Sequence, residues 1–120
     1  MKLQYTHARL CSLIDKCGDL VTSSDSCGDH LQESVAVELT VLIAKYDEVL
    51  SQSYQSLEAV FLVKYLFQLC NTTSKALKLL PVINAETEEA GAARLRMFQA
   101  ARVVLADAMT VMGITPLERI

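Results

Sequence analysis

The sequence predicts an all-α helical bundle of about four to five helices, and three observations point to this fold class. Apolar residues make up 52% of the 120 residues, which is enough for one buried core. Only four Gly and two Pro are present, and no segment alternates apolar and polar residues as a strand does. Apolar residues recur instead every three or four positions. We therefore expect a single domain over residues 1–120.

The first predicted helix covers residues 3–17 and has two contrasting faces. Its apolar side carries Leu3, Leu10, Leu13, Ile14 and Cys17. Its opposite side is basic and aromatic, with Lys2, Tyr5, Arg9, Ser12 and Lys16. Gly18 is a typical stop signal, and GDLVTSSDSCGD at residues 18–29, rich in Ser, Asp and Gly, is predicted to form a solvated connector.

Three further helices are predicted over residues 33–50, 57–80 and 88–112. SQSYQ, residues 51–55, is expected to connect the second helix to the third. Pro81 ends the third helix because its ring cannot continue one, Thr87 is the expected N-cap of the fourth, and Gly113 ends it. The third helix has a polar row formed by Glu58, Lys64, Gln68, Asn71, Lys75 and Lys78.

Two polar residues fall on or near apolar faces. Arg94 projects to the middle of the apolar face of the fourth helix, where an unpaired charge is costly. We therefore predict an ion pair with an acidic neighbour and a structural role, with RNA contact as the alternative. His7 lies towards the apolar edge of the first helix, which favours a hydrogen-bonded packing residue over a base or a ligand.

Charge and cysteine usage restrict the function. The formal net charge of −3 does not suit a protein that coats nucleic acid, so any RNA site must be local. The four cysteines follow no signal peptide and are interpreted as reduced thiols of an intracellular protein. His7 with Cys11, and Cys27 with His30, do not complete a zinc ligand set, so no metal is expected. No apolar run reaches the length of about 18 that spans a bilayer.

Three segments resemble one known family. LQYTHARLCSL at residues 3–13, AARL at 92–95 and MGITPLERI at 112–120 closely resemble the C-terminal, DALR-type anticodon-binding domain of arginyl-tRNA synthetases. The resemblance covers essentially the whole chain, and KYDEVL at 45–50 is similar to the mitochondrial form, which favours the mitochondrial matrix over the cytoplasm. It implies a module that recognises the anticodon loop of arginine tRNA as part of an arginine–tRNA ligase.

The resemblance also implies what this chain lacks. The catalytic domain of such a class I, ATP-dependent enzyme is absent, so residues 1–120 are expected to be a piece of a longer protein. We expect no catalytic residue and no cofactor here, since ATP and arginine would bind the absent domain. The expected partners are arginine tRNA and that catalytic domain, and neither DNA nor a membrane.

The resemblance implies roles for particular residues. Tyr5 would stack on an anticodon base and Arg9 would contact a base edge or a phosphate, in agreement with their exposed positions four apart on one face. Lys2 and Lys16 serve either phosphate attraction or solubility. The loop after the third helix offers Pro81 or Val82 where the family often has an aromatic, and the chain ends in Ile120 where Met is usual. At 105–109 LADAM replaces LANGM, so Asp107 adds a negative charge.

Two other functions remain open from the residues themselves. Tyr5 and Arg9 also fit a solvated face with a cation resting near a ring. The runner-up function is then a helical protein-interaction or structural module with eroded RNA contacts. An independent enzyme would rest on His7 and Cys11 alone, which lack an orienting third group and oxyanion donors.

Overall fold

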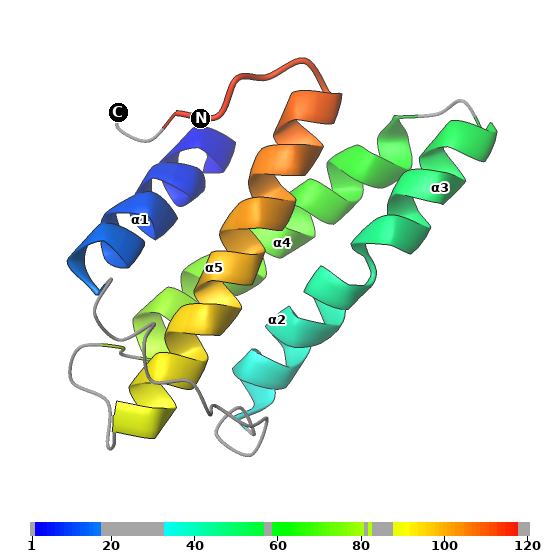
Figure 1. Ribbon diagram of the computed structural model, residues 1–120. Helices are drawn as coiled ribbons and strands as arrows, with labels where there is room; N and C mark the ends of the chain where they lie inside the picture. Colours follow the sequence, from blue (N-terminus) through cyan, green and yellow to red (C-terminus); the bar gives the residue numbers. More distant parts are fainter. Residues whose placement is uncertain (1, 18–32, 57–58, 81, 83–87, 118–120) are drawn as a thin grey trace.

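The computed structural model describes residues 2–17, 33–56, 59–80, 82 and 88–117, and within these ranges it contains five helices and no strand. The helices are α1 (Lys2–Lys16), α2 (Ser34–Ala44), α3 (Tyr46–Ser56), α4 (Val60–Leu79) and α5 (Glu88–Val111) (Figure 1). The predicted all-α bundle is confirmed. The loop predicted at residues 18–29 and the N-cap predicted at Thr87 lie outside the described residues.

Helix α4 lies at the centre of the bundle. It packs against all four other helices, while α5 also packs against α1 and α2. Helices α2 and α3 follow one side of this pair, and α1 lies on the other side (Figure 1). The largest fully buried apolar side chains are Leu10, Leu39, Leu66, Leu69, Leu95, Phe98, Leu105 and Met109. Each stabilises the fold by about 1.5–3 kcal/mol through removal of apolar surface from water.

The end of α5 follows the sequence prediction closely. Gly113 has φ +82°, the left-handed conformation that glycine adopts without a Cβ penalty. The N–H of Ile114 donates to the carbonyl of Met109 at 2.8 Å, and the N–H of Gly113 donates to that of Thr110 at 3.0 Å. These two bonds form a Schellman motif, which ends the helix and turns the chain back towards α1.

The helix predicted over residues 33–50 is wrong in one respect, because it is divided at Lys45 into α2 and α3. The hydroxyl of Tyr65 in α4 donates to the carbonyl of Leu42 at 2.5 Å, one turn before the division. The N–H of Lys45 is shared between the carbonyls of Val41 and Leu42. A side chain that engages a carbonyl of the helical ladder loosens the helix at that point.

SQSYQ is also not the connector that the sequence predicted, because residues 51–55 lie inside α3. Asp47 and Glu48 occupy the first turn of α3, where acidic side chains interact favourably with the helix dipole. Val49 and Leu50 are partly buried against the core. Dipole and packing together outweigh the polar composition of this segment.

The described part of the chain gives two further findings. It contains no helix long and apolar enough to cross a membrane. Cys11, Cys17 and Cys70 are buried and form no disulfide, and Cys27 lies outside the described residues. Burial raises the pKa of the Cys17 thiol, against the smaller lowering effect of Lys16.

Candidate nucleic-acid interface

The outward face of α1 presents an aromatic ring and a cation in contact. Tyr5 is 57% exposed, and the guanidinium carbon of Arg9 lies 5.6 Å from the centroid of its ring. Such a cation–π pair contributes about 0.5–1 kcal/mol at an exposed site. Ser12 and Lys16 on the same face are exposed as well. Lys2 begins the helix, and its side chain lies outside the described part.

The opposite face of α1 fixes the helix to the bundle. Leu10 is completely buried, and Leu3, Leu13 and Ile14 pack against the core. The helical periodicity of the sequence predicted these residues on the apolar face of the first helix. Since α1 packs against both α4 and α5, the ring of Tyr5 projects from a fixed helix rather than from a loop.

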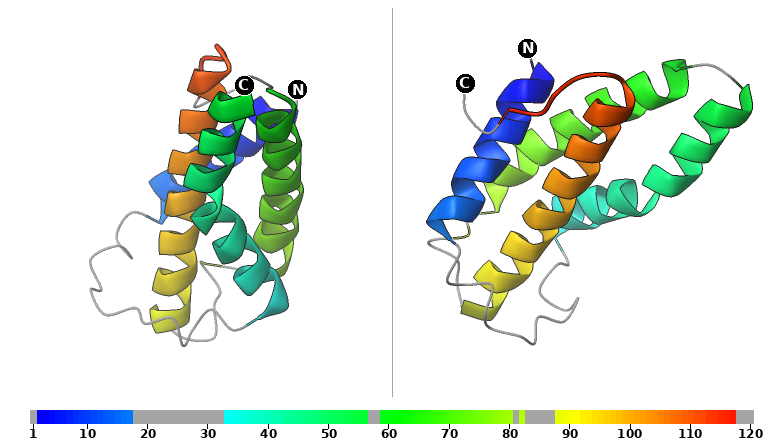
Figure 2. Two further views of the ribbon diagram at one scale, coloured as in Figure 1. Left: turned by 90° about the vertical axis from the view of Figure 1, so that its right-hand side faces the viewer. Right: turned by 45° about the horizontal axis from the view of Figure 1, so that its top comes forward.

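Residues 114–117, which we call the tail, lie against α1 (Figure 2). The side-chain amide of Gln4 donates from Nε2 to the carbonyl of Thr115 at 2.7 Å, and its Oε1 accepts from the N–H of Leu117 at 2.8 Å. The Nδ1 of His7 lies 2.7 Å from the carbonyl oxygen of Leu117, which can only accept. We refer to these three bonds, which bring the two ends of the chain together, as the tail contact.

Sequence reasoning missed Gln4, although a signal was available. The two segments that carry the strongest resemblance, residues 3–13 and 112–120, are the two ends of the chain. A motif divided between the ends indicates that they meet in the fold. Helical periodicity alone places Gln4 merely on a flank of α1.

The packing role predicted for His7 is confirmed. Its side chain is 3% exposed, and besides the tail contact it approaches the sulfur of Cys11, with Nδ1 and Sγ 3.8 Å apart. Both groups are buried, and the ring of His7 contacts the backbone carbonyl of Leu117 in the tail. The hydrogen bond of His7 to Leu117 therefore helps to hold the tail on α1.

The ion pair predicted for Arg94 is present. Its Nη2 lies 3.1 Å from Oε1 of Glu33, and the two side chains are 4% and 40% exposed. The sequence predicted Glu33 as the first residue of the second helix, next to the acidic connector, and the structure places it in extended conformation at the N-cap position of α2. Arg94 thus links α5 to the start of α2, which is the structural role expected.

Of the other residues predicted to contact RNA after the third helix and at the C-terminus, the structure describes only Val82. Val82 is 5% exposed and belongs to the hydrophobic core, so its side chain packs inward. Pro81 and Ile120 lie outside the described residues. Among the described positions, therefore, the exposed RNA-binding candidates are Tyr5 and Lys16, with the half-buried Arg9 resting on the ring of Tyr5.

Asp107 has a partner inside the bundle. The hydroxyl of Tyr46 donates to its Oδ2 at 2.5 Å, and the Tyr46 ring stacks on Tyr65 with centroids 5.9 Å apart. Burial, together with the bond to Asp107 and its charge, raises the pKa of Tyr46 above its usual range. Burial raises the pKa of Tyr65 to about 12. Both hydroxyls therefore remain neutral donors at physiological pH.

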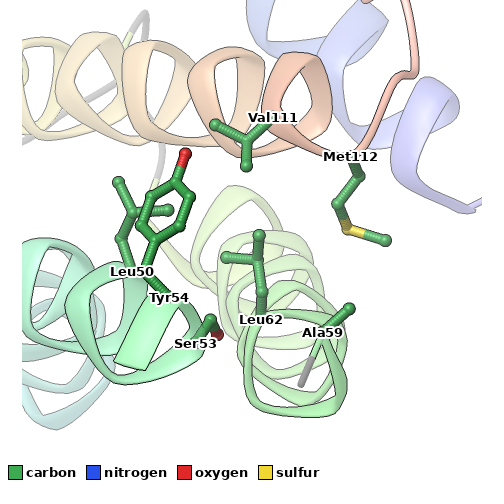
Figure 3. Close-up of a pocket in the computed structure, with 7 residues that line it drawn as sticks. All are labelled: Leu50, Ser53, Tyr54, Ala59, Leu62, Val111 and Met112. Carbon is green, nitrogen blue, oxygen red and sulfur yellow. The ribbon is translucent and has the colours of Figure 1, made fainter. Parts of the chain in front are cut away.

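A cavity of about 180 Å³ lies between α3, the start of α4 and the end of α5 (Figure 3). Its lining is apolar apart from Ser53 and Tyr54, namely Leu50, Ala59, Leu62, Val111 and Met112. It contains no carboxylate, imidazole or thiol that could act as an acid, a base or a nucleophile. Nowhere in the described ranges do three His, Cys, Asp or Glu side chains gather as metal ligands do.

The fold and the site define an all-α module with an aromatic–arginine pair on its surface, an arrangement suited to single-stranded RNA. The family model of the DALR anticodon binding domain matches residues 3–120, and the chain belongs to this family.

Among similar proteins, a probable mitochondrial arginine–tRNA ligase of Mus musculus is 44% identical over 119 residues, covering 98% of this chain and 20% of the relative. A probable cytoplasmic arginine–tRNA ligase of Dictyostelium discoideum is 37% identical over 117 residues, with the same coverage. The mitochondrial arginine–tRNA ligase of Saccharomyces cerevisiae is 35% identical over 119 residues, covering 98% of this chain and 18% of the relative. The chain thus spans about a fifth of the length of these relatives.

Proposed function

We propose that this chain is the anticodon-binding module of an arginine–tRNA ligase, and that the Tyr5 face of α1 contacts the anticodon loop of arginine tRNA. The observation that carries the proposal is the exposed Tyr5 ring with the guanidinium of Arg9 5.6 Å from its centroid. The similarity to arginine–tRNA ligases supports the choice of tRNA. The mitochondrial names of several relatives support a mitochondrial parent enzyme.

The physical mechanism is stacking combined with charge. An unpaired anticodon base stacks on Tyr5, and Arg9 donates hydrogen bonds to a base edge or a phosphate. Lys16, exposed on the same face, attracts the phosphate backbone, as Lys2 is expected to do. Chemistry on arginine and ATP belongs to the rest of the parent enzyme, for which the module positions the tRNA.

Fluorescence titration with the anticodon stem-loop of arginine tRNA tests this function. We expect micromolar or weaker binding that falls steeply with salt and is lost in Tyr5→Ala and in Arg9→Ala. Tyr54→Ala is the matched control, since Tyr54 is 66% exposed on α3. A stem-loop with a different anticodon should bind more weakly to the wild type.

Equal affinity of the wild type, Tyr5→Ala and Arg9→Ala would overturn the proposal. The helical protein-interaction module predicts that result, because it requires no RNA contact from α1.

A further inference from the structure

The outward face of α4 carries positive charge without any acid. Its 20 residues include Lys64, Lys75 and Lys78 and contain neither Asp nor Glu. The whole chain, in contrast, has 14 acidic and 11 basic residues. The charge of α4 is therefore opposite in sign to that of the molecule, which makes this face a local attractor for anions.

The polar residues of α4 form one continuous row. Lys64, Gln68, Asn71, Lys75 and Lys78 follow one another at spacings of four and three residues, so they share one side of the helix, and all are exposed. We call this row the α4 stripe. With a rise of 1.5 Å per residue it is about 21 Å long. None of its three lysines forms an ion pair with a described residue.

An exposed aromatic residue borders the stripe. Phe67 is 50% exposed and lies three residues from Lys64 and four from Asn71, the separations at which helical side chains are neighbours. Lysines beside an exposed ring combine phosphate attraction with base stacking, as single-stranded RNA sites do. Protein interfaces, in contrast, are depleted in lysine.

A polar groove extends the stripe towards α2. Gln68, Asn71, Thr72 and Lys75 line it together with Glu38. Amide and hydroxyl groups there can bond a sugar–phosphate backbone, and Glu38 is the one acid in the lining. Repulsion by Glu38 acts at the α2 side, so Lys64 and Lys78 at the two ends of the stripe contribute most to anion attraction.

We propose that the α4 stripe with Phe67 is a second RNA-contact surface, which binds the sugar–phosphate backbone of the RNA whose loop meets α1. Helix α1 packs directly on α4, so the two surfaces belong to adjacent helices. Backbone contacts position an RNA without reading its sequence. The inference rests on the proposed function, and it separates recognition at Tyr5 from affinity supplied by α4.

The test compares single lysine variants by the salt dependence of stem-loop binding. Lys64→Gln and Lys78→Gln should each reduce the slope of log K against log salt by about 0.7–0.9, and Lys75→Gln should reduce it less, because Lys75 shares the groove with Glu38. Their ratio of affinities for matched and altered anticodons should stay that of the wild type. Lys45→Gln is the matched control, because Lys45 is exposed between α2 and α3 and the charge change is the same. Phe67→Ala should weaken binding without changing the slope.

The results distinguish the two proposals. Slopes for the stripe variants equal to that of Lys45→Gln would overturn the second surface while leaving the effect of Tyr5→Ala intact. If the stripe variants reduce the slope and Tyr5→Ala has no effect, the stripe is supported and the proposed anticodon site is overturned. A wild-type chain that binds no stem-loop at low salt overturns both.

Discussion

The side chain of Gln4 accepts a hydrogen bond from the backbone N–H of Leu117, across 113 positions of the sequence. The same amide donates to Thr115, so a single glutamine contacts the backbone on both sides of Pro116. Pro116 has no N–H of its own and the chain resumes no helix there, so the side chain of Gln4 supplies two hydrogen bonds that this segment does not make within a helix. The tail is therefore held on α1 by specific bonds.

Loss of this amide should release the tail. Gln4→Ala removes two hydrogen bonds and should lower the free energy of unfolding by about 1 kcal/mol, since both are exposed. The exchange of the Leu117 amide proton with solvent should accelerate, which hydrogen-exchange NMR measures. Gln4→Glu keeps an acceptor for Leu117 but places an oxygen against the Thr115 carbonyl. Gln55→Ala on α3 is the control, and an unchanged Leu117 exchange rate in Gln4→Ala would contradict the assignment.

The Arg94–Glu33 pair predicts an asymmetry between its two partners. In Glu33→Ala the guanidinium of Arg94, whose side chain is 4% exposed, loses its contact with the Glu33 carboxylate. The free energy of unfolding should fall by about 1–3 kcal/mol. The figure is below that of a fully buried pair because Glu33 is 40% exposed. Arg94→Met removes the buried charge and should be tolerated better. Urea unfolding of both variants measures the order, and a greater loss in Arg94→Met would refute it.

Stability should fall in alkaline solution. Tyr65 has a folded-state pKa of about 12, raised by burial above the usual value of about 10. Its neutral form is favoured by folding, so this stabilisation is complete below pH 10 and is lost as pH rises from about 10 to about 12. Unfolding measured across this range should show a shallower decline in Tyr65→Phe. Identical declines in both proteins would exclude Tyr65 as the cause.

The turn at Gly113 should resist substitution for a conformational reason alone. No atom lies within 4 Å of a Cβ built there, but the φ of +82° disfavours L side chains. Gly113→Ala should therefore cost about 1 kcal/mol, and Gly113→Asn should cost less because Asn tolerates this region. Thermal unfolding compares the two, and equal stability of Gly113→Ala and the wild type would show that the turn relaxes.

Local rules predicted those elements whose partners are close in sequence. Helix α1 was predictable from the spacing of its apolar residues, and the end of α5 was predictable from Gly113. Both signals depend on residues only a few positions apart. The division at Lys45 was not, because it depends on the hydroxyl of Tyr65, 23 positions after Leu42. The need of Arg94 for an acid was predictable from its apolar face, whereas the identity of that acid was not.

The sequence by itself determined that the chain is an all-α bundle, that Tyr5 and Arg9 share an outward face, that His7 is a packing residue and that Arg94 pairs with an acid. Each follows from helical periodicity and from the cost of burying an unpaired polar group. Only the tertiary structure decided that Gln4 contacts the tail, that Glu33 pairs with Arg94 and that Val82 packs into the core. These contacts join segments distant in sequence, and helical periodicity carries no information on which distant segments the packing of helices brings together.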